Sequence, residues 1–182
     1  MNKKTLLLAF SSILALSGCT KTIVESANNQ TMASFDNQSI KQVVNELIQL
    51  DIDTYHVYNQ AAKNVKDKAL KDLLLNFAAK HEGHVNALSK VVLDLGGHPP
   101  SFSRDFKGFL TSGYTAIKVA GGKQKTLEAM KTNELISKKY YDKALSISMP
   151  RNIKEVIKSN LEDEKDHLEA IFDMQQNLKV NR

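Results

Sequence analysis

From Ile40 onward, apolar residues recur at intervals of three and four, and no useful length of the chain alternates at period two. Intervals of three and four are typical of amphipathic helices. We therefore predict four helices, at about 39–65, 69–95, 125–148 and from about 150 onward. Short connections within the first pair and within the second make each pair an antiparallel hairpin. The pattern predicts an all-α protein.

The segment between the second and third predicted helices has its own pattern. The second helix is expected to stop at Gly96-Gly97, because the Pro99-Pro100 pair that follows cannot continue it. An apolar stripe then predicts a crossover containing a fifth, shorter helix that covers the core; a lid or membrane-facing role for its Phe residues is the alternative. The stripe consists of Phe102, Phe106, Phe109, Leu110, Gly113 and Ile117.

The second hairpin repeats the first at an offset of 83 residues. Such agreement within one sequence indicates duplication of a hairpin, which predicts a four-helix bundle with approximate two-fold symmetry. Pairs at this offset include Tyr58 with Tyr141, Ala61 with Ala144, His84 with His167 and Leu95 with Leu178.

Six polar residues occupy or flank the apolar seams. Asp51 precedes two histidines by 30 and 33 residues, and Glu134 precedes a Glu and a His by the same two separations. Since each hairpin turn lies about midway, the three acids and three imidazoles are expected at one level inside the bundle. The six are Asp51, His81, His84, Glu134, Glu164 and His167.

This combination of residue types suits a metal site. A spacing of three places His81 with His84, and Glu164 with His167, on one helix face. Carboxylate and imidazole ligands suit iron, manganese or zinc, whereas the absence of thiolate disfavours copper(I) and iron–sulfur clusters. Buried carboxylates cost several kcal/mol each unless they are paired or bind a metal. The alternative is a structural polar layer in which protonated histidines neutralise the acids.

The pattern of one carboxylate on the first and third helices, a pair at spacing three on the second and Glu-x-x-His on the fourth resembles the ferritin-like superfamily, including rubrerythrin-type di-iron proteins. The chain is also similar to an uncharacterised bacterial ferritin-like family. Glu134, Glu164 and His167 match the motif, whereas Asp51 and His81 replace its usual Glu residues.

The resemblance implies iron chemistry, either ferrous oxidation or peroxide reduction. It implies Asp51, His84, Glu134 and His167 as terminal ligands, Glu164 as a bridge and His81 as a variant ligand. Because imidazole replaces a bridging carboxylate at His81, one tightly held ion or an asymmetric pair is an alternative to a full di-iron centre. Tyr58 and Tyr141 could supply electrons, or could simply be core aromatics.

The N-terminus has the pattern of a secretion signal. Lys3 and Lys4 precede the apolar stretch Leu6–Leu16, which is too short to span a hydrocarbon core of ~30 Å. The sequence that follows resembles a lipobox, so we predict a signal peptide at 1–18 and acylation, palmitate included, of Cys19. Residues 19–38 would then form a flexible tether and 39–180 the bundle. The protein is expected in the cell envelope, at the periplasmic side of the outer membrane if the cell is Gram-negative.

Composition narrows the partners. The chain has 182 residues, 25 of them basic and 20 acidic, and one Cys, so it has no internal disulfide. Acidic residues are interspersed wherever lysines are dense, which disfavours a nucleic-acid partner. Assembly with copies of itself is left open, and so are a catalytic role, metal sequestration without turnover and a purely structural role. Three further residues, Glu46, Asp53 and His56, are expected on a solvent-facing stripe, His98 in a turn, and Glu82 and Glu162 in a second layer around the site.

Overall fold

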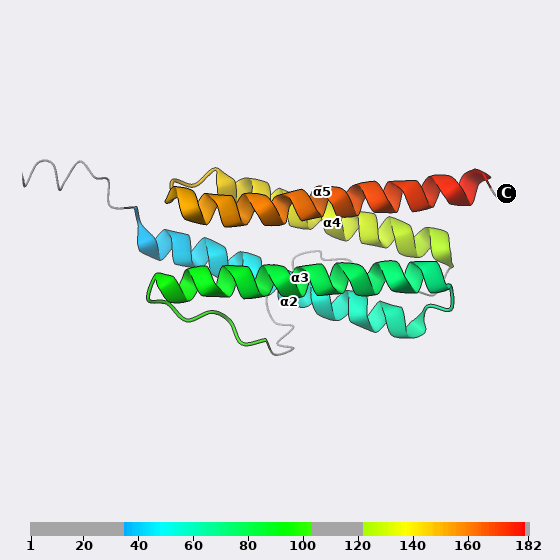
Figure 1. The fold of residues 1–182 in the computed structure, drawn as a ribbon, viewed down its shortest axis with the longest axis horizontal. Coiled ribbons are helices and arrows are strands. Elements are labelled where there is room, and N and C mark those ends of the chain that lie inside the picture. Colours follow the sequence, from blue (N-terminus) through cyan, green and yellow to red (C-terminus); the bar gives the residue numbers. More distant parts are fainter. Residues whose placement is uncertain (1–34, 103–121, 181–182) are drawn as a thin grey trace, which may run out of the picture. The chain divides into compact units, whose positions relative to one another are not determined.

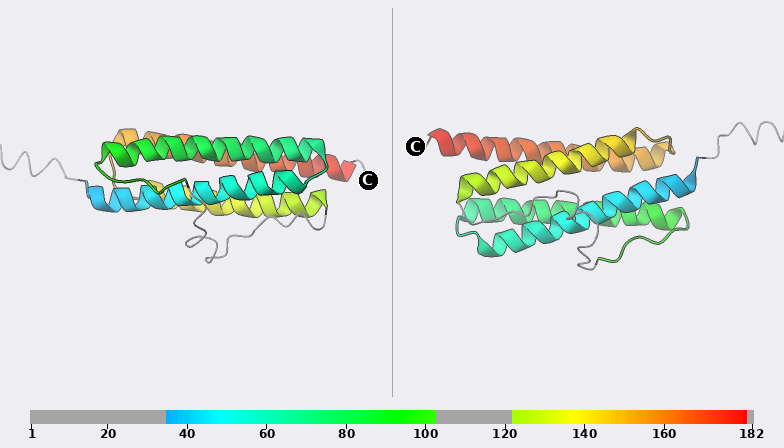
Figure 2. Two further views of the ribbon diagram at one scale, coloured as in Figure 1. Left: turned by 90° about the horizontal axis from the view of Figure 1, so that it is seen from below. Right: turned by 180° about the vertical axis from the view of Figure 1, so that it is seen from behind.

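The computed structural model describes residues 35–102 and 122–180. Within these ranges the chain forms four helices and no strand, and the four run side by side with short connections inside each hairpin (Figures 1 and 2). The predicted all-α four-helix bundle is confirmed. The helices are α2 (Asn37–Asn64), α3 (Lys68–Asp94), α4 (Lys123–Leu145) and α5 (Arg151–Val180).

Two predicted features lie outside the described residues. One is the signal sequence with Cys19, and the other is the helical crossover, of which only Phe102 belongs to the described part. The two hairpins, α2 with α3 and α4 with α5, make the most extensive contacts, and α2–α4 and α3–α5 contacts join them into one bundle.

The helix ends follow local rules. The carboxylates of Asp36 and Asp67 accept hydrogen bonds from backbone N–H groups in the first turns of α2 and α3, at 3.1 and 2.8 Å. At the end of α3, Gly97 N–H donates to the Val92 carbonyl and Gly96 N–H to the Leu93 carbonyl, both at 2.9 Å. Gly96 has φ of 68°, as this type of helix stop requires.

Helix α4 ends at Leu145, earlier than the predicted 148. Pro150 disfavours helical backbone at Met149, so the chain leaves the helix before the proline. The Met149 side chain is nevertheless buried, and the turn between α4 and α5 therefore packs on the core.

The apolar core is divided in two. One cluster includes Leu47, Leu88 and Ile157, and the other includes Leu74 and Phe77. The six polar seam residues are buried as well, and none of them belongs to either cluster. A buried polar layer therefore interrupts the core.

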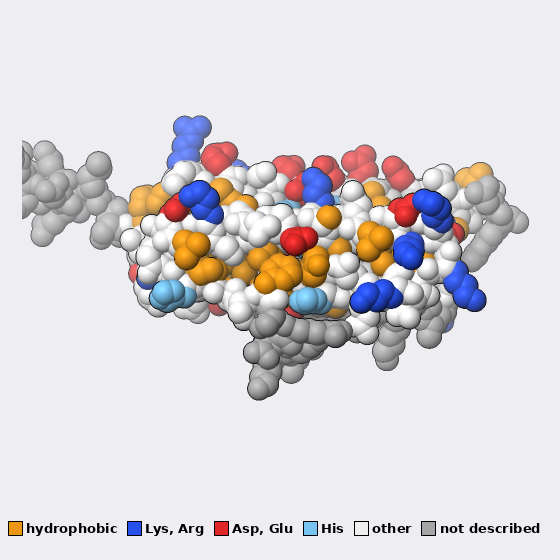
Figure 3. All heavy atoms as spheres, turned by 60° about the horizontal axis from the view of Figure 1, so that its bottom comes forward, with side chains coloured by type: hydrophobic (Ala, Val, Ile, Leu, Met, Phe, Trp, Pro, Cys, Tyr) orange, Lys and Arg blue, Asp and Glu red, His pale blue; other side chains and the backbone are white. Residues whose placement is uncertain are grey.

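The surface carries both signs of charge. Exposed lysines pair with acids one helical turn away, as in Lys90–Asp94 at 2.9 Å and Lys138–Asp142 at 2.6 Å. Figure 3 shows one face on which basic and acidic side chains alternate around a row of hydrophobic ones. None of the described helices combines the length and the apolar character that a membrane crossing needs.

Candidate metal centre

The structure brings the six polar seam residues together in the middle of the bundle. Each helix contributes at least one of them, and none is more than 3% exposed. They form two overlapping groups, and in each group one potential ligand atom per residue lies within 4.8 Å of the others. We call Asp51, His81, His84 and Glu164 half-site 1, and His81, Glu134, Glu164 and His167 half-site 2.

Asp51 is held from both sides in half-site 1. The Nδ1 atom of His81 lies 2.8 Å from Asp51 Oδ1, and the hydroxyl of Tyr141 donates to Asp51 Oδ2 at 2.6 Å. Asn160 Nδ2 in turn donates to the Tyr141 hydroxyl at 3.2 Å. Helix α4 thus supports a carboxylate on α2.

Glu134 has the corresponding partners in half-site 2. The Tyr58 hydroxyl donates to Glu134 Oε1, and His167 Nδ1 lies 2.9 Å from Glu134 Oε2. The ring of Phe77 stacks on that of His167, with centroids 3.9 Å apart. Each tyrosine therefore binds the carboxylate of the other hairpin, as expected of a two-fold duplicated bundle.

Glu164 is different, because neither of its carboxylate oxygens has a hydrogen-bond partner among the described residues, although both are buried. Its Oε1 lies 3.5 Å from His84 Nδ1 and 3.7 Å from His81 Nδ1. His81 Nε2 and His84 Nδ1 also lack hydrogen bonds. Buried polar atoms in native proteins are nearly always paired. These converging oxygen and nitrogen atoms therefore fit a first-row transition-metal cation.

The carboxylates and imidazoles of the polar layer shift one another's pKa values. Burial by itself raises the pKa of Asp51, but the hydrogen bond from His81 and the nearby ring of His84 outweigh it and the pKa is lowered. Burial is likewise outweighed at Glu134, whose pKa is lowered by His167 and His81. Burial also opposes protonation of His81, yet the surrounding carboxylates raise its pKa well above 6.5. Two carboxylates thus face one imidazolium.

The pKa values of Glu164 and His167 are shifted in the directions that favour their uncharged forms. Burial, together with the nearby Glu134 and Asp51, raises the pKa of Glu164 well above 4.5 in spite of the attraction of His81. Burial lowers the pKa of His167 and outweighs its bond to Glu134. A cation that binds here has to displace the protons held by His81 and Glu164.

The residue that bonds to the outer ring nitrogen of His84 was not among those predicted for the second layer around the site. Asp163 Oδ2 lies 3.0 Å from His84 Nε2, and Asp163 Oδ1 accepts from Lys80 Nζ at 2.9 Å. Glu82 and Glu162, expected in this second layer, are both exposed. The repeat could have indicated Asp163. It occupies the position equivalent to Lys80 at the offset of 83 residues, and the opposite charges of the two residues suit an ion pair between the hairpins.

The predicted solvent stripe of α2 is also corrected. Asp53 is only 3% exposed, and Gln49 donates to its Oδ1 at 3.1 Å. His56 is half-buried, and the ring of Phe102 lies against those of His56 and Tyr55 at 5.8 and 5.0 Å. The segment after α3 therefore returns over this face of α2, which periodicity alone could not reveal.

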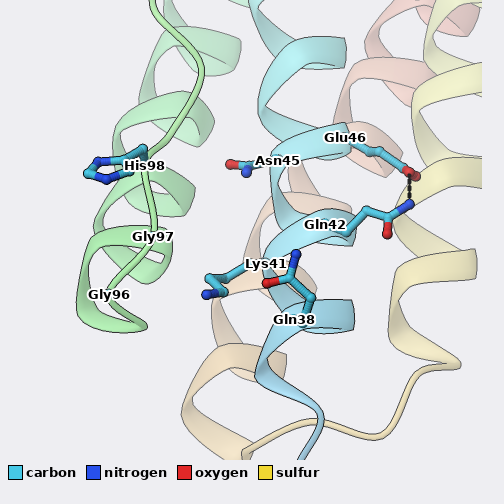
Figure 4. A pocket seen from close by; sticks show the side chains of 8 residues that line it. All are labelled: Gln38, Lys41, Gln42, Asn45, Glu46, Gly96, Gly97 and His98. Atoms are coloured by element: carbon cyan, nitrogen blue, oxygen red, sulfur yellow. Dashed lines mark hydrogen bonds between the residues drawn. The ribbon is translucent and has the colours of Figure 1, made fainter.

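A surface pocket lies away from the centre, between the start of α2 and the end of α3 (Figure 4). Gln42 donates to Glu46 there at 3.3 Å, and His98 is exposed in the turn, as predicted. None of the six polar seam residues lines it. Among the described residues, both clusters that could hold a metal ion lie in the buried layer instead.

Comparison with known proteins identifies the family. Residues 39–146 match the model of a family described as a domain of unknown function, DUF2383. The chain belongs to this family. The match spans α2, α3 and α4, and thus four of the six polar seam residues. A comparison with curated proteins finds no match.

A solved structure shares the fold. It is a bacterioferritin-related protein of Bacteroides fragilis, described as a dodecameric thioferritin, with a TM-score of 0.70 and 13% identity over 86% of this chain and 95% of that one. At this identity the likeness shows a ferritin-like fold alone. Since 224 chains of solved structures match, the fold is widespread, and the chemistry has to be inferred from the residues of the buried layer.

Proposed function

We propose that this protein is a transition-metal-binding lipoprotein of the cell envelope, with iron as the metal and Cys19 as the point of lipid attachment. The observation that carries the metal assignment is Glu164, a fully buried carboxylate with no hydrogen bond to the protein. A cation would satisfy Glu164 together with the unpaired nitrogens of His81 and His84. Iron, manganese and zinc all accept such ligands, and the ferritin-like fold favours iron.

The competing structural role, a polar layer that only fixes helix register, accounts for part of the geometry. Asp51 with His81, and Glu134 with His167, are well paired without any ion. A purely structural role does not explain Glu164, because a buried carboxylate kept only for structure would be expected to accept a hydrogen bond. Metal binding accounts for all three acids.

We further propose that the bound metal supplies oxidation chemistry, either ferrous oxidation or peroxide reduction. Asp51 and Glu134 would balance the charge of the cation, and Glu164 would bridge where two ions bind. The hydroxyls of Tyr58 and Tyr141 donate directly to these two carboxylates, so each tyrosine is one hydrogen bond away from a proposed ligand. That position suits a proton or electron donor to the site. The ferritin-like relative is described as a dodecamer, and we propose self-association of this chain as well, which light scattering tests.

The test is metal analysis of the protein expressed without residues 1–18 and purified without added metal. We expect iron in amounts that scale with protein, and the same yield of folded protein but little metal from a variant carrying Glu164→Gln. Metal-free protein that also takes up no ferrous iron under anaerobic conditions would contradict metal binding. Oxygen and peroxide consumption by the iron-loaded protein then separates turnover from sequestration, the second candidate.

A further inference from the structure

The two half-sites are related by the duplication but differ at their outer edge. His81 and Glu164 are common to both, so the half-sites are distinguished by Asp51 with His84 in one and Glu134 with His167 in the other. Behind His84 lies the carboxylate of Asp163, 3.0 Å from Nε2. The residue equivalent to Asp163 in the first hairpin is Lys80, which pairs with Asp163 itself. Only one of the two terminal histidines therefore has a carboxylate behind it.

This difference sets which ring nitrogen of each histidine carries a lone pair. A carboxylate can only accept, so His84 donates from Nε2 to Asp163, and neutral His84 then has its lone pair on Nδ1. That Nδ1 lies 3.6 Å from Asp51 Oδ1 and 3.5 Å from Glu164 Oε1, within half-site 1. His84 is thus oriented as a ligand by its outer hydrogen bond, as metal-binding histidines commonly are.

His167 has the opposite arrangement. Its Nδ1 donates to Glu134 at 2.9 Å, which leaves the lone pair of the neutral ring on Nε2. To bind an ion through Nδ1, His167 has to transfer its proton to Nε2, and that atom is buried without a hydrogen-bond partner in the protein. The ring face is occupied by Phe77, which cannot accept the proton in the way Asp163 does.

His81 adds to the asymmetry. Its Nδ1 faces Asp51 at 2.8 Å and its Nε2 faces Glu134 at 3.6 Å. If Nδ1 binds an ion in half-site 1, the neutral ring keeps its hydrogen on Nε2, and half-site 2 then receives an N–H group in place of a ligand. Occupation of the first half-site thereby weakens the second.

We infer that the chain binds one divalent first-row metal ion with preference at half-site 1, and that Asp163 is the positioning residue that selects this half by orienting His84. The inference rests on the proposed metal-binding function and specifies where in the layer it operates. Half-site 2 is held by its internal hydrogen bonds from Tyr58 and His167 to Glu134, and it takes a second ion only at higher concentration.

The experiment is titration of the metal-free protein lacking residues 1–18 with cobalt(II), following the visible ligand-field bands and, by calorimetry, the number of ions bound. The native chain should bind one equivalent tightly. His84→Gln should abolish the tight equivalent, whereas the repeat-matched His167→Gln should retain it. Asp163→Asn should weaken it by about 10- to 100-fold, the range typical for outer partners of metal ligands. The control Lys80→Gln should change it by less than about threefold, because the Asp163–His84 bond remains.

A charge exchange gives the sharpest test. The double variant Lys80→Asp with Asp163→Lys transfers the carboxylate to the repeat position on the side of His167. Tight binding should then become sensitive to His167→Gln and tolerant of His84→Gln. Far-ultraviolet circular dichroism confirms that each variant is folded, and Asp163→Asn alters a partly exposed side chain outside the core. Failure of the native chain to bind cobalt would contradict the proposed function itself. Binding of two equivalent cobalt ions by the native chain, or an equal loss of affinity in His84→Gln and His167→Gln, would overturn the inference. Neither result would contradict metal binding itself.

Discussion

Glu164 differs from Asp51 and Glu134, the other two carboxylates of the polar layer, because no described residue donates a hydrogen bond to it. Asp51 and Glu134 each receive a tyrosine hydroxyl and face a histidine nitrogen, whereas both oxygens of Glu164 are unpaired. Because its pKa is raised well above 4.5, Glu164 favours its protonated form in the fold at pH values above about 4.5, where the unfolded chain has released that proton. Glu164 therefore costs stability in the metal-free protein, a common property of residues retained for function.

Replacing Glu164 should consequently have opposite effects on stability and on metal binding. We expect Glu164→Gln to raise the unfolding free energy of the metal-free protein at pH 8, because glutamine has no proton whose release burial opposes. The same variant should lose most bound metal. Glu162→Gln is the matched control, because Glu162 is exposed beside it and pairs only with Lys165. Urea denaturation and elemental analysis measure the two effects; a destabilised metal-free variant would show that the buried acid is structural.

The protonation of His81 and Glu164 predicts how the metal-free protein responds to pH. The raised pKa of His81 gives stability that is complete below about 6.5 and is lost as pH rises through the folded value. The raised pKa of Glu164 adds a cost that grows above about 4.5, where the unfolded chain loses its proton. The lowered pKa values of Asp51 and Glu134 act only on the acid side. Both dominant groups thus weaken the fold as pH rises.

The lowered pKa of His167 opposes this trend only below about 6.5. The melting temperature of chelator-treated protein should therefore fall between pH 6.5 and 8.5, by about 2–4 °C for each kcal/mol lost. His98→Gln, which removes an exposed histidine in a turn, should leave this slope unchanged, whereas His81→Gln should flatten it. Metal affinity should show the reverse trend, because binding displaces the same protons. A melting temperature that stays level or rises across this range would contradict the protonated imidazole.

At the scale of single helices, the ends of α3 are determined by local chemistry. Asp67 caps its start. At its end, the backbone N–H groups of Gly96 and Gly97 donate hydrogen bonds to carbonyls of the last turn. Gly83, by contrast, is exposed in the interior of the same helix, and a Cβ at that position would meet no atom within 4 Å. Helix α3 thus contains a glycine that its backbone does not require, and the turn that ends it contains one that it does.

Alanine at these two positions should shift stability in opposite directions. Gly96→Ala should lower the unfolding free energy by about 1–2 kcal/mol, because φ of 68° is unfavourable for a residue with a Cβ. Gly83→Ala should raise it by roughly 0.5–1 kcal/mol through helix propensity, with metal content unchanged although His81 and His84 flank the site. Denaturant titration measures both. Stabilisation by Gly96→Ala would show that α3 does not end in this turn.

Most of the element arrangement could be predicted because it depends on periodicity. The spacing of 30 and 33 residues around each turn places the six polar residues at one level, and the structure brings them together. Asp163 and Asp53 were missed for different reasons. The contact of Asp163 with His84 depends on how α5 is rotated against α3, and the burial of Asp53 occurs on the face of α2 against which Phe102 packs. The periodicity of a sequence predicts neither how two helices are rotated against each other nor which loop packs on a helix face.

At the scale of the molecule, duplication gives two hairpins with nearly the same pattern but unequal details. Equivalent positions of the two hairpins hold different residues around the polar layer, such as Lys80 and Asp163, or Phe77 and Asn160. The two tyrosines of the layer are nevertheless equivalent, because each donates to a carboxylate of the other hairpin. A symmetric frame can therefore hold an asymmetric centre.

The lipobox-like sequence predicts that the protein is attached to a membrane through a lipid on Cys19, the one cysteine in the chain. Cys19→Ser should abolish labelling by radioactive palmitate and move the protein from the membrane pellet to the soluble fraction, because no other thiol can accept the acyl group. A single acyl chain gives only marginal membrane binding, and two or more are needed for stable retention, so loss of the multiply acylated cysteine should release nearly all of the protein. Ser17→Ala, which keeps a small residue near the predicted cleavage point, is the control and should stay labelled. If the Cys19→Ser protein still incorporates palmitate, attachment occurs elsewhere and residues 1–18 act in another way. Metal content of the released protein should equal that of the anchored form, because the polar layer is built entirely from α2 to α5.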